Sequence, residues 1–565
     1  MQLTGAQILV RTLIEQGADT VFGYPGGQVI NIYDALHECT DQLRHVLTAH
    51  EQGASHAADG YARATGRPGV CLATSGPGAT NLVTGLATAF LDSIPVVAIT
   101  GNVPTDLLGR DSFQEVDITG VTMPVTKHNF LVDDATDIAQ TIQDAFRIAS
   151  SGRPGPVLVD ITKNAQVQRI DYQPIGRYEC EATPSIDPKD LEDAARLIRK
   201  SERPLLYVGG GIMAPGAAKS LLAFAEKMCL PIASTTRGLS AIPTTERLYL
   251  GMLGMHGAPV CSYAVGRCDL LICVGARFAD RVTGSRDKFA PKAQKIHIDI
   301  DASEINKNIV VDCGIVGDAT EALDQLAERL ERVEQRPWLH ELIQYKARNP
   351  LPENVNEQGV ELRNVLKAVR LIMGEDTIIA TDVGQHQMIT AQYYHFDRPR
   401  TFLSSLGLGT MGFGMGAALG AQTAFPNRPV AMITGDGSFH MNFNEFATAV
   451  TEKLPIVVIV DNNQVLGMVR QWQSLFFEKR YSQTTPRRQT DFVQLAQALG
   501  GDGYRIESND EIRTTLQNAY LTARANQRPC IIECAVDPNE FVFPIIPPGG
   551  TGEDTIYEAY QGMDM

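Results

Sequence analysis

The stretch that decides the fold is GDGSFHMNFNEFATAVTEKLPIVVIVDNN, residues 435–463, in which an aspartate stands between two glycines and two asparagines close the segment. Between these ends lie a segment of helical character and an apolar run, IVVIV, that predicts a buried strand. The residues just before it, PVAMIT, predict a second strand. Ligands of open parallel sheets bind at the carboxyl ends of the strands, so Asp436 and Asn463 are expected to face the same ligand.

Strands and helices alternate in the same way through the rest of the chain. Apolar runs that predict strands are followed by glycine-rich turns and helical segments, which is the pattern of a parallel sheet wound with helices. More polar segments, one ending near residue 185 and one over 334–359, predict linkers. The sequence therefore predicts an α/β protein of three doubly wound parallel-sheet domains, at 1–172, 186–340 and 360–540, with a C-terminal tail over 541–565.

An internal similarity supports this division. CLATSGPGATNLVTGLATAFLDSIPVVAITGN, residues 71–102, repeats the order of features in residues 431–463. Both stretches have a strand, a Gly-x-Gly turn, an Ala/Thr-rich helix, a proline and a strand at nearly equal spacing. Two domains of the same fold are therefore expected on either side of a different one. Chance similarity between two strand–helix–strand units is the alternative.

Composition and charge argue against several classes of protein. The chain has 565 residues, 44% of them hydrophobic, and a formal net charge of −16, which disfavours a nucleic-acid partner. No apolar stretch approaches the roughly 20 residues that cross a bilayer, and the N-terminus lacks the basic start and apolar core of a signal peptide. The ten cysteines are dispersed without zinc-site spacing. We expect them to be reduced and mostly buried in a cytoplasmic protein.

The oxygen atoms expected at the edge of the sheet suit a magnesium ion. Mg²⁺ prefers near-octahedral oxygen ligands, commonly one or two protein side chains with phosphate oxygens and water. The Asp436 carboxylate, the Asn463 side chain and a backbone carbonyl near Val465 would leave positions for two phosphate oxygens. Gly437 lets backbone amides approach those phosphates, and the helix N-terminus after Ser438 favours negative charge. A turn that uses Asp and Asn only for backbone conformation is the alternative.

A GDG motif with NN 27 residues after its aspartate resembles the shared motif of the thiamine diphosphate enzymes. Thiamine chemistry also needs a carboxyl group, shielded from water, that hydrogen-bonds the aminopyrimidine ring. The resemblance implies that Glu51, in HVLTAHEQG, is that group; taken alone it would be an ordinary helix N-terminal charge. The resemblance also implies that Glu51 and the diphosphate site of one active centre come from different subunits, hence a dimer at least.

Nearly the whole chain is similar to the catalytic subunits of the biosynthetic acetohydroxyacid synthase (acetolactate synthase) family. The resemblance is carried by stretches that include FGYPGGQVINIYDAL, SFQEVDITG, GMLGMHG, VGARFADRVTG, TDVGQHQM, GLGTMGFG and LGMVRQWQSLFF. It implies decarboxylation of pyruvate and transfer of the remaining fragment to a second pyruvate or to 2-ketobutyrate. The products, 2-acetolactate or 2-aceto-2-hydroxybutyrate, would feed branched-chain amino acid biosynthesis.

The resemblance also implies roles for individual residues. Arg281 would bind the carboxylate of the acceptor ketoacid, while Trp472 and Met255 would wall its alkyl tail. The positions that would line the reaction pocket are Gly27, Phe113, Gln114 and Lys127. The implied thiamine diphosphate contacts are Gln385, His386, Gly409, Met411, Gly437, Ser438 and Met468, with Met468 and Val469 supporting the bent shape of the cofactor from below.

The middle region resembles the FAD-binding domain of the same family. The matching positions are Arg153, Gly209, Gly210, Gly211, His256, Arg277, Asp299 and Asp318. Because the carboligation transfers no electrons overall, this FAD would be structural. An empty Rossmann-like domain is the alternative, but acetolactate synthases without FAD lack the GARFxDRVTG pattern, which favours FAD.

The chain departs from the family pattern at a few positions. Gln28 stands where alanine is usual, Ala279 replaces the first aspartate of the RFDDR form, Leu406 replaces a small residue, and Met415-Gly416 replaces Leu-Pro. Gln28 puts substrate preference or inhibitor sensitivity in question. The other departures fall on supporting turns and remove no group that we expect to be catalytic.

Two other functions stay open at this point. A flavin-using pyruvate oxidase would employ FAD as an electron acceptor, and a non-catalytic partner would only bind nucleotide or thiamine. The presence of Glu51, Asp436 and Asn463 argues against the second. The family resemblance further implies a homodimer or homotetramer, a separate regulatory small subunit and no membrane association.

Overall fold

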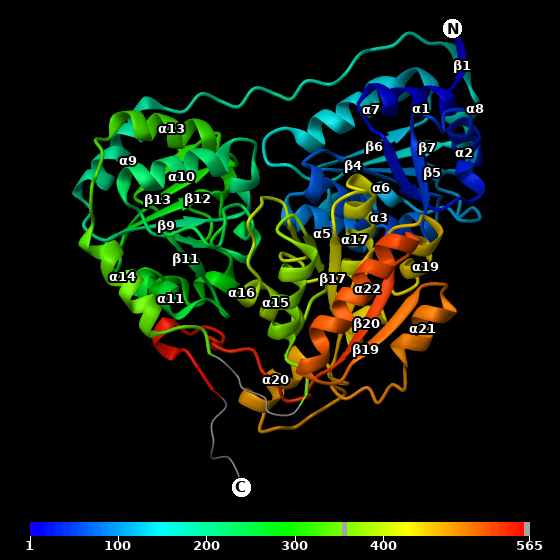
Figure 1. Ribbon diagram of the computed structural model, residues 1–565. Helices are drawn as coiled ribbons and strands as arrows, with labels where there is room; N and C mark the ends of the chain where they lie inside the picture. Colours follow the sequence, from blue (N-terminus) through cyan, green and yellow to red (C-terminus); the bar gives the residue numbers. More distant parts are fainter. Residues whose placement is uncertain (353–358, 559–565) are drawn as a thin grey trace.

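Three sheets organise the computed structural model, which describes residues 1–352 and 359–558. Each sheet has six strands, and all neighbouring strands within these three sheets run parallel. Figure 1 shows the N-terminal sheet in blue, the central sheet in green and the C-terminal sheet in yellow to red, each flanked by helices. The predicted α/β class with three parallel-sheet domains is confirmed.

The N-terminal domain has the strand order β3-β2-β4-β5-β7-β6. Its first and last strands, β1 and β8, pair with each other as an antiparallel ribbon. Its elements are β1 (Gln2–Thr4), α1 (Gly5–Glu15), β2 (Thr20–Gly23), α2 (Ile30–His37), β3 (Arg44–Leu47), α3 (Glu51–Thr65), β4 (Gly69–Ala73), α4 (Pro77–Asn81), α5 (Val83–Asp92), β5 (Val96–Asn102), α6 (Ile118–Thr122), β6 (His128–Val132), α7 (Ala135–Ser150), β7 (Val157–Thr162), α8 (Lys163–Val167) and β8 (Arg169–Asp171).

The C-terminal domain repeats this order with the strands β16-β15-β17-β18-β20-β19. In both sheets the strands lie, counted along the chain, second, first, third, fourth, sixth, fifth, so the internal similarity reflects one shared fold. Its elements are α15 (Leu362–Met373), β15 (Ile378–Thr381), α16 (Gln385–Tyr393), β16 (Phe402–Ser404), α17 (Phe413–Ala424), β17 (Val430–Gly435), α18 (Asp436–Phe439), α19 (Glu445–Thr451), β18 (Val457–Asn462), α20 (Gly467–Phe476), α21 (Phe492–Ala498), β19 (Asp502–Ile506), α22 (Ile512–Asn526) and β20 (Cys530–Ala535).

The central domain differs from the other two. Its strand order, β11-β10-β9-β12-β13-β14, is the third-second-first-fourth-fifth-sixth order of dinucleotide-binding sheets. Its elements are α9 (Pro188–Lys200), β9 (Pro204–Val208), α10 (Ala217–Met228), β10 (Ile232–Ser234), β11 (Tyr249–Met252), α11 (Pro259–Arg267), β12 (Leu270–Val274), α12 (Asp280–Thr283), β13 (Gln294–Asp299), β14 (Cys313–Val316), α13 (Ala319–Arg329) and α14 (Pro337–Arg348). The expected Rossmann-like character of the middle region is confirmed.

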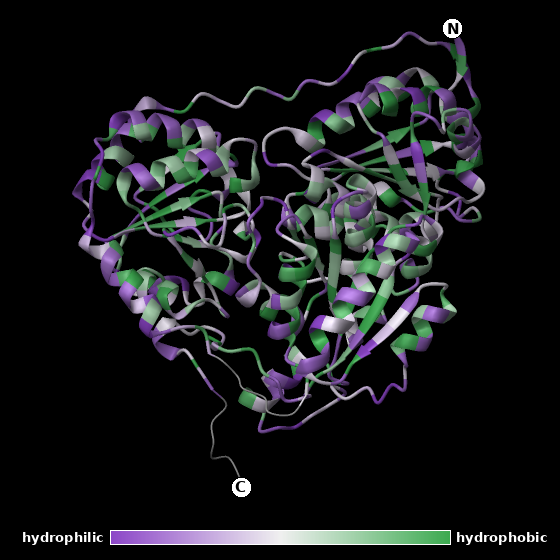
Figure 2. Ribbon diagram, in the orientation of Figure 1, coloured by the Kyte–Doolittle hydropathy of each residue, from purple (hydrophilic) through white to green (hydrophobic). Residues whose placement is uncertain are grey.

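Local sequence explains where these elements form. β5 is buried along its whole length and β18 along all but its last residue, as expected of parallel strands covered on both faces. α7 and α9 begin behind Asp134 and Asp187, whose carboxylates accept hydrogen bonds from backbone amides two residues further on. Figure 2 shows the consequence: the strands inside each domain are mostly apolar, while the outer helices carry polar residues on one side.

The N-terminal and C-terminal domains share one continuous apolar core. At its centre α3 packs against α17, and both helices are rich in alanine and glycine. A Cβ atom at Gly420 would lie 2.0 Å from Ala57 O, so the two backbones approach as closely as glycine permits. Beside this contact the rings of His56 and Phe413 meet edge to face, with centroids 5.3 Å apart.

The two predicted linkers have different outcomes. Residues 172–187 contain no helix or strand and cross between the N-terminal and central domains in Figure 1, as predicted. The prediction over 334–359 is wrong for α14, whose Trp338 is 2% exposed and donates its indole N–H to Pro204 O at 3.1 Å. This helix packs on the central domain through an apolar stripe, which the polar residues of its other face make hard to recognise in the sequence. Residues 353–358 of that predicted linker lie outside the described residues.

The tail after residue 540 lies against the central domain. Ile546 N donates to Met255 O at 2.8 Å, and Ser285 N donates to Gly550 O at 3.3 Å. The tail is therefore part of the surface around Met255.

The cysteines and the composition of the helices bear on the class of protein. All ten cysteines are free and eight are buried, as expected. Among residues 1–352 and 359–558, no helix combines the length and the apolar composition needed to span a membrane.

Candidate active site

β17 and β18 are neighbours in register, with Gly435 opposite Asp461. Asp436 follows the end of β17 as the first residue of α18, and Asn463 follows the end of β18. Both residues are 7% exposed. The predicted adjacency of the two strands is thus confirmed, and the two side chains emerge from the same carboxyl edge of the sheet.

A third strand brings further polar groups to this edge. β15 leads into α16, whose first residues are Gln385 and His386. Asn463 Nδ2 donates to Gln385 Oε1 at 3.4 Å, and its Oδ1 accepts from Val465 N at 3.1 Å. His386 is 4% exposed, and its Nε2 has no hydrogen-bond partner among the described residues. An unpartnered buried imidazole nitrogen at a helix N-terminus fits an anionic group such as a diphosphate.

Glycines let the neighbouring segments approach these groups closely. A Cβ atom at Gly435 would lie 3.0 Å from His386 Nδ1, and one at Gly437 would lie 2.6 Å from Leu466 Cδ2. Ser438 Oγ donates to Val383 O at 2.9 Å, which ties α18 to the segment between β15 and α16. The segments after β15, β17 and β18 therefore converge on one site.

The Asp436 carboxyl is held in a weakly hydrated position. Burial raises its pKa to about 6, because the charged form loses water. A cation beside it would offset that cost. No group of three or more His, Cys, Asp and Glu side chains in the described part of the chain could hold a metal. The donors at this edge, one carboxylate with amide and backbone carbonyl oxygens, fit Mg²⁺.

The fourth segment at this edge is the β16–α17 loop, residues 405–412. It contains the predicted contacts Gly409 and Met411, and Gly409 and Gly412 have φ values of +74° and +88° that favour glycine. Thr410 N donates to Ser405 Oγ at 3.0 Å within the loop. Met468 lies on α20 beside the apolar core, while Val469 is 53% exposed.

Glu51 is the first residue of α3, behind the cap residue His50. Its Oε2 accepts from Asn81 Nδ2 at 3.0 Å, and a Cβ atom at Gly78 would lie 3.2 Å from its Oε1. No hydrogen bond within residues 1–352 and 359–558 joins Glu51 to Asp436 or Asn463. The hydrogen bond of the Glu51 side chain is made within the N-terminal domain.

The other predicted reaction-pocket residues divide into two groups. Gly27 follows β2 and a Cβ atom there would meet no atom within 4 Å, while Gln114 packs its backbone on Gly76, in the same turn that contacts Glu51. Phe113 beside it is 85% exposed. Lys127 lies elsewhere: it precedes β6 at the amino edge of the sheet, and its Nζ donates to the carbonyls of Ile148 and Ser151.

The three residues assigned to acceptor binding meet across a domain boundary. The Arg281 guanidinium lies 5.7 Å from the ring centroid of Trp472, which α20 supplies from the C-terminal domain. Arg281 Nη1 lies 3.9 Å from Met255 Sδ, and Met255 N donates to Arg281 O at 2.9 Å. The Arg281 side chain is 65% exposed, so its charge is accessible beside two apolar surfaces.

The predicted FAD positions of the central domain follow the carboxyl ends of its strands. Gly209 to Gly211 follow β9, Arg277 follows β12, Asp299 ends β13 and Asp318 follows β14. Ligands of this sheet order bind along that edge. The Arg277 guanidinium makes no hydrogen bond or ion pair with any described residue, which suits a phosphate ligand.

Several of these positions already have protein partners. Asp318 caps α13 by accepting from Thr320 N at 2.8 Å. His256 Nδ1 contacts Pro544 O at 3.0 Å, and Arg153 Nη1 donates to Glu304 Oε1 at 2.7 Å. A Cβ atom at Gly209 would lie 2.3 Å from Gly275 O, so this glycine permits close packing of two loops.

Sequence reasoning missed residues that hold the site from other parts of the chain. Glu445, on α19, accepts from the backbone amides of Ala49 and His50 just before Glu51. Asp382 accepts from Gly414 N at 2.7 Å at the start of α17. Asp382 had a visible signal, an acid directly after a buried strand, but nothing local to Glu445 points to a contact almost 400 residues away.

Three family models of the thiamine pyrophosphate (thiamine diphosphate) enzymes match the chain: the N-terminal TPP binding domain over 3–121, the central domain over 191–326 and the C-terminal TPP binding domain over 382–534. The acetolactate synthase large subunit of Corynebacterium glutamicum is 46% identical, covering 98% of this chain and 90% of its own length. Acetolactate synthase isozyme 2 large subunit of Escherichia coli is 44% identical, covering 98% and 99%. The probable acetolactate synthase large subunit of Methanocaldococcus jannaschii is 44% identical, covering 97% and 94%. This chain belongs to the acetolactate synthase large-subunit family.

The departures from the pattern of the acetolactate synthase family lie around the same edges. Gln28 N donates to Thr74 Oγ1 at 3.2 Å beside Gly27, and Ala279 occupies the N-cap position of α12, which carries Arg281, without a side-chain capping bond. Leu406 lies at the base of the β16–α17 loop.

Proposed function

We propose that the chain catalyses thiamine diphosphate-dependent decarboxylation of pyruvate and carboligation to a second pyruvate or to 2-ketobutyrate. The products are 2-acetolactate and 2-aceto-2-hydroxybutyrate, precursors of the branched-chain amino acids. The observation that carries the proposal is the match along almost the whole chain to acetolactate synthase large subunits of three organisms. The contact among Arg281, Met255 and Trp472 supports a site for an anionic acceptor with a small alkyl tail.

In this proposal the carboxyl edge of the C-terminal sheet holds the cofactor. Asp436, Asn463 and the Val465 carbonyl hold Mg²⁺. The diphosphate and the rings are held by Gln385, His386, Gly437, Ser438, Gly409, Met411 and Met468. When bound, thiamine diphosphate supplies the carbon nucleophile of the reaction. Glu51, which is partly buried and accepts a hydrogen bond from Asn81, would hydrogen-bond the aminopyrimidine ring and hold a proton there.

The acceptor is bound by residues of the chain itself. Arg281 pairs with its carboxylate. Trp472 and Met255 cover the alkyl tail, where one methylene is worth about 1–3 kcal/mol. Gly27, Phe113 and Gln114 line the reaction pocket. Lys127 is the least supported member of the set, because its ammonium group bonds carbonyls at the amino edge of its sheet.

FAD occupies the central domain in this proposal as a structural cofactor. The supporting observations are the strand order of that sheet and the partly buried Arg277 at its carboxyl edge, whose guanidinium has no protein partner among the described residues. Release of a flavin absorbance spectrum on denaturing the purified protein tests this point. Absence of flavin after reconstitution with FAD would oppose it.

We further propose a homodimer or homotetramer in the cytoplasm, with each active centre built from two chains, and a separate regulatory small subunit. The relatives are named large subunits, which supports the smaller partner. The hydrogen bonding of Glu51 within its own domain supports the shared active centre.

Product analysis tests the proposed reaction most directly. The protein is incubated with pyruvate, Mg²⁺, thiamine diphosphate and FAD, with and without 2-ketobutyrate. We expect acetolactate without oxygen uptake, and the six-carbon product when 2-ketobutyrate is added. Oxygen uptake with acetate or acetyl phosphate formation would identify a pyruvate oxidase instead. A Glu51→Gln variant as active as the wild type would oppose the assigned role of Glu51.

A further inference from the structure

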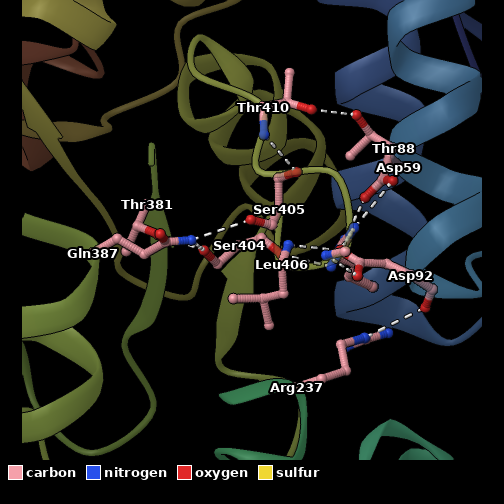
Figure 3. Close-up of polar contacts among 12 residues, drawn as sticks. Asp59, Thr88, Asp92, Arg237, Thr381, Gln387, Ser404, Ser405, Leu406 and Thr410 are labelled. Carbon is pink, nitrogen blue, oxygen red and sulfur yellow. Dashed lines mark hydrogen bonds and ion pairs between the residues drawn. The ribbon is translucent and has the colours of Figure 1, made fainter. Parts of the chain in front are cut away.

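A cluster of buried charges lies where the three domains meet (Figure 3). Arg63, near the end of α3, pairs with Asp59 one turn earlier and with Asp92, the last residue of α5. Arg63 Nη2 lies 2.8 Å from Asp92 Oδ2, and these three residues are at most 5% exposed. From the central domain, Arg237 Nε donates to the backbone carbonyl of Asp92 at 3.4 Å. Burying charged side chains costs free energy unless they are paired and hydrogen-bonded.

The cluster bonds the base of the β16–α17 loop. Asp92 accepts two backbone N–H groups, from Leu406 at 3.0 Å through Oδ2 and from Gly407 at 2.8 Å through Oδ1. Arg63 Nη1 donates to Ser404 O at 2.8 Å. One ion pair of the N-terminal domain therefore binds three backbone groups within residues 404–407, at the entry of a C-terminal-domain loop. The sequence separation exceeds 300 residues, so this is a tertiary and not a local device.

Packing also keeps the loop close to α5. A Cβ atom at Gly407 would lie 2.8 Å from Leu91 Cβ and 2.9 Å from Leu91 O, so only glycine fits there without displacement. Beyond this point the loop is open, since Leu408 is 42% exposed. The open part leads directly into Gly409 and Met411, the positions assigned to thiamine.

The C-terminal domain itself holds the two ends of the loop, and at the far end Asn442 Nδ2 donates to Gly412 O at 3.1 Å. Gln387 Nε2 donates to Ser404 Oγ at 2.6 Å and to Ser405 O at 3.1 Å (Figure 3). Among the described residues, Asp92 is the side chain that accepts from the amides at 406 and 407. Burial alone would raise the pKa of Asp92, but Arg63 and Arg237 hold it below its ordinary value. The carboxylate therefore stays ionised, with both oxygens available as acceptors.

We propose that Asp92, oriented by Arg63 and Asp59, is a positioning residue that shapes the β16–α17 loop for thiamine diphosphate. The inference rests on the proposed function for the identity of the ligand. The affinity for thiamine diphosphate then depends on a contact between domains, because the β16–α17 loop adopts its cofactor-binding conformation when α5 packs against it. Asp92 acts through the backbone of the loop and touches no reacting atom.

The principal test compares Asp92→Asn with the wild type. Asn keeps the volume but has one acceptor oxygen in place of two and no charge for Arg63. Without cofactor, we expect faster hydrogen exchange in the peptide that covers residues 404–412. With Mg²⁺ present, we expect the dissociation constant of thiamine diphosphate to rise about tenfold or more, and turnover at saturating cofactor to recover most of the wild-type value. A purely structural defect would lower turnover without this dependence on cofactor concentration.

Asp19→Asn is the matched control. Asp19 belongs to the same domain and pairs with Arg67 at 2.9 Å, but its contacts do not include the β16–α17 loop. We expect wild-type exchange in residues 404–412 and wild-type cofactor affinity for this variant. Equal effects of the two substitutions would overturn the proposal.

A second variant keeps the test decisive if Asp92→Asn fails to fold. Gly407→Ala removes no charge and pushes the loop away from Leu91 and from Asp92 Oδ1, which its Cβ atom would approach to 3.0 Å. We expect the same rise in exchange and in the dissociation constant. Unchanged exchange and unchanged affinity in both variants would overturn the proposal. If the wild type binds no thiamine diphosphate, the proposed function fails, whereas the exchange measurement still reports whether Asp92 shapes the loop.

Discussion

At the scale of single residues, Trp472 is the side chain whose role can be measured most cleanly. It faces Arg281 from another domain and offers a wide apolar surface beside a charge. We predict that Trp472→Leu lowers the preference for 2-ketobutyrate over pyruvate several-fold, because part of the contact with the extra methylene is lost. The ratio of the two products from mixed acceptors measures this.

Phe477→Leu, which changes an exposed aromatic residue just beyond α20, is the control and should leave the product ratio unchanged. An unaltered ratio in Trp472→Leu would contradict the assignment of Trp472 to acceptor choice.

The residues of the site differ in how far sequence could reveal them. Asp436 and Asn463 were predictable, because each follows an apolar strand and parallel strands share an edge. Arg281 and Trp472 were suggested by family resemblance, and their meeting across two domains is a structural finding. Asp92 had no local signal: it closes an ordinary helix, and its role depends on amides more than 300 residues away.

At the scale of elements, the contact between α3 and α17 depends on glycine. We predict that Gly420→Ala destabilises the protein by about 1–3 kcal/mol, because the added methyl group would collide with Ala57 O. Thermal unfolding of the apo protein measures this. Gly266→Ala on α11 is the control, since a Cβ atom there meets nothing within 4 Å. Alanine should be neutral or slightly stabilising at that position. Equal midpoints for the two variants would contradict the packing argument.

In the same helix pair, His56 on α3 should make the stability of the protein depend on pH. Burial, with smaller contributions from Arg63 and His50, lowers the pKa of His56 to about 3. At pH values between about 3 and the ordinary histidine pKa of 6.5, His56 is protonated in the unfolded chain and neutral in the folded protein. The His56 contribution to stability therefore falls as the pH drops below 6.5.

We predict that lowering the pH from 7.5 to 5.5 destabilises the wild type by about 1.4 kcal/mol more than His56→Gln. Thermal midpoints of the two proteins at both pH values measure the difference. If the two proteins differ in midpoint by the same amount at both pH values, His56 is not the source of this pH dependence.

Elements with strong patterns were predictable, and elements with mixed patterns were not. The buried strands around residues 71–102 and 431–463 stand out because nearly every residue in them is apolar or small. α14 was taken for a linker because polar and charged residues together outnumber its buried Trp338, Leu339 and Leu342. Its stability comes from the central domain on which it packs, which a local pattern does not contain.

At the scale of the whole molecule, the proposed sharing of active centres between chains predicts complementation. Glu51→Gln and Asp436→Asn should each be inactive alone. When the two are denatured, mixed in equal amounts and refolded together, mixed dimers regain one intact centre. We expect up to roughly a quarter of the wild-type activity in the mixture. No recovery despite proven mixed dimers would place each centre within one chain.

The shared core of α3 and α17 has a consequence for biosynthesis. Residue 413 leaves the ribosome 348 residues after residue 65, which takes roughly 20–70 s at ordinary elongation rates. During that interval the alanine- and glycine-lined face of α3 has no partner from its own polypeptide. Nascent chains stalled before α17 should therefore be the species that chaperones retain.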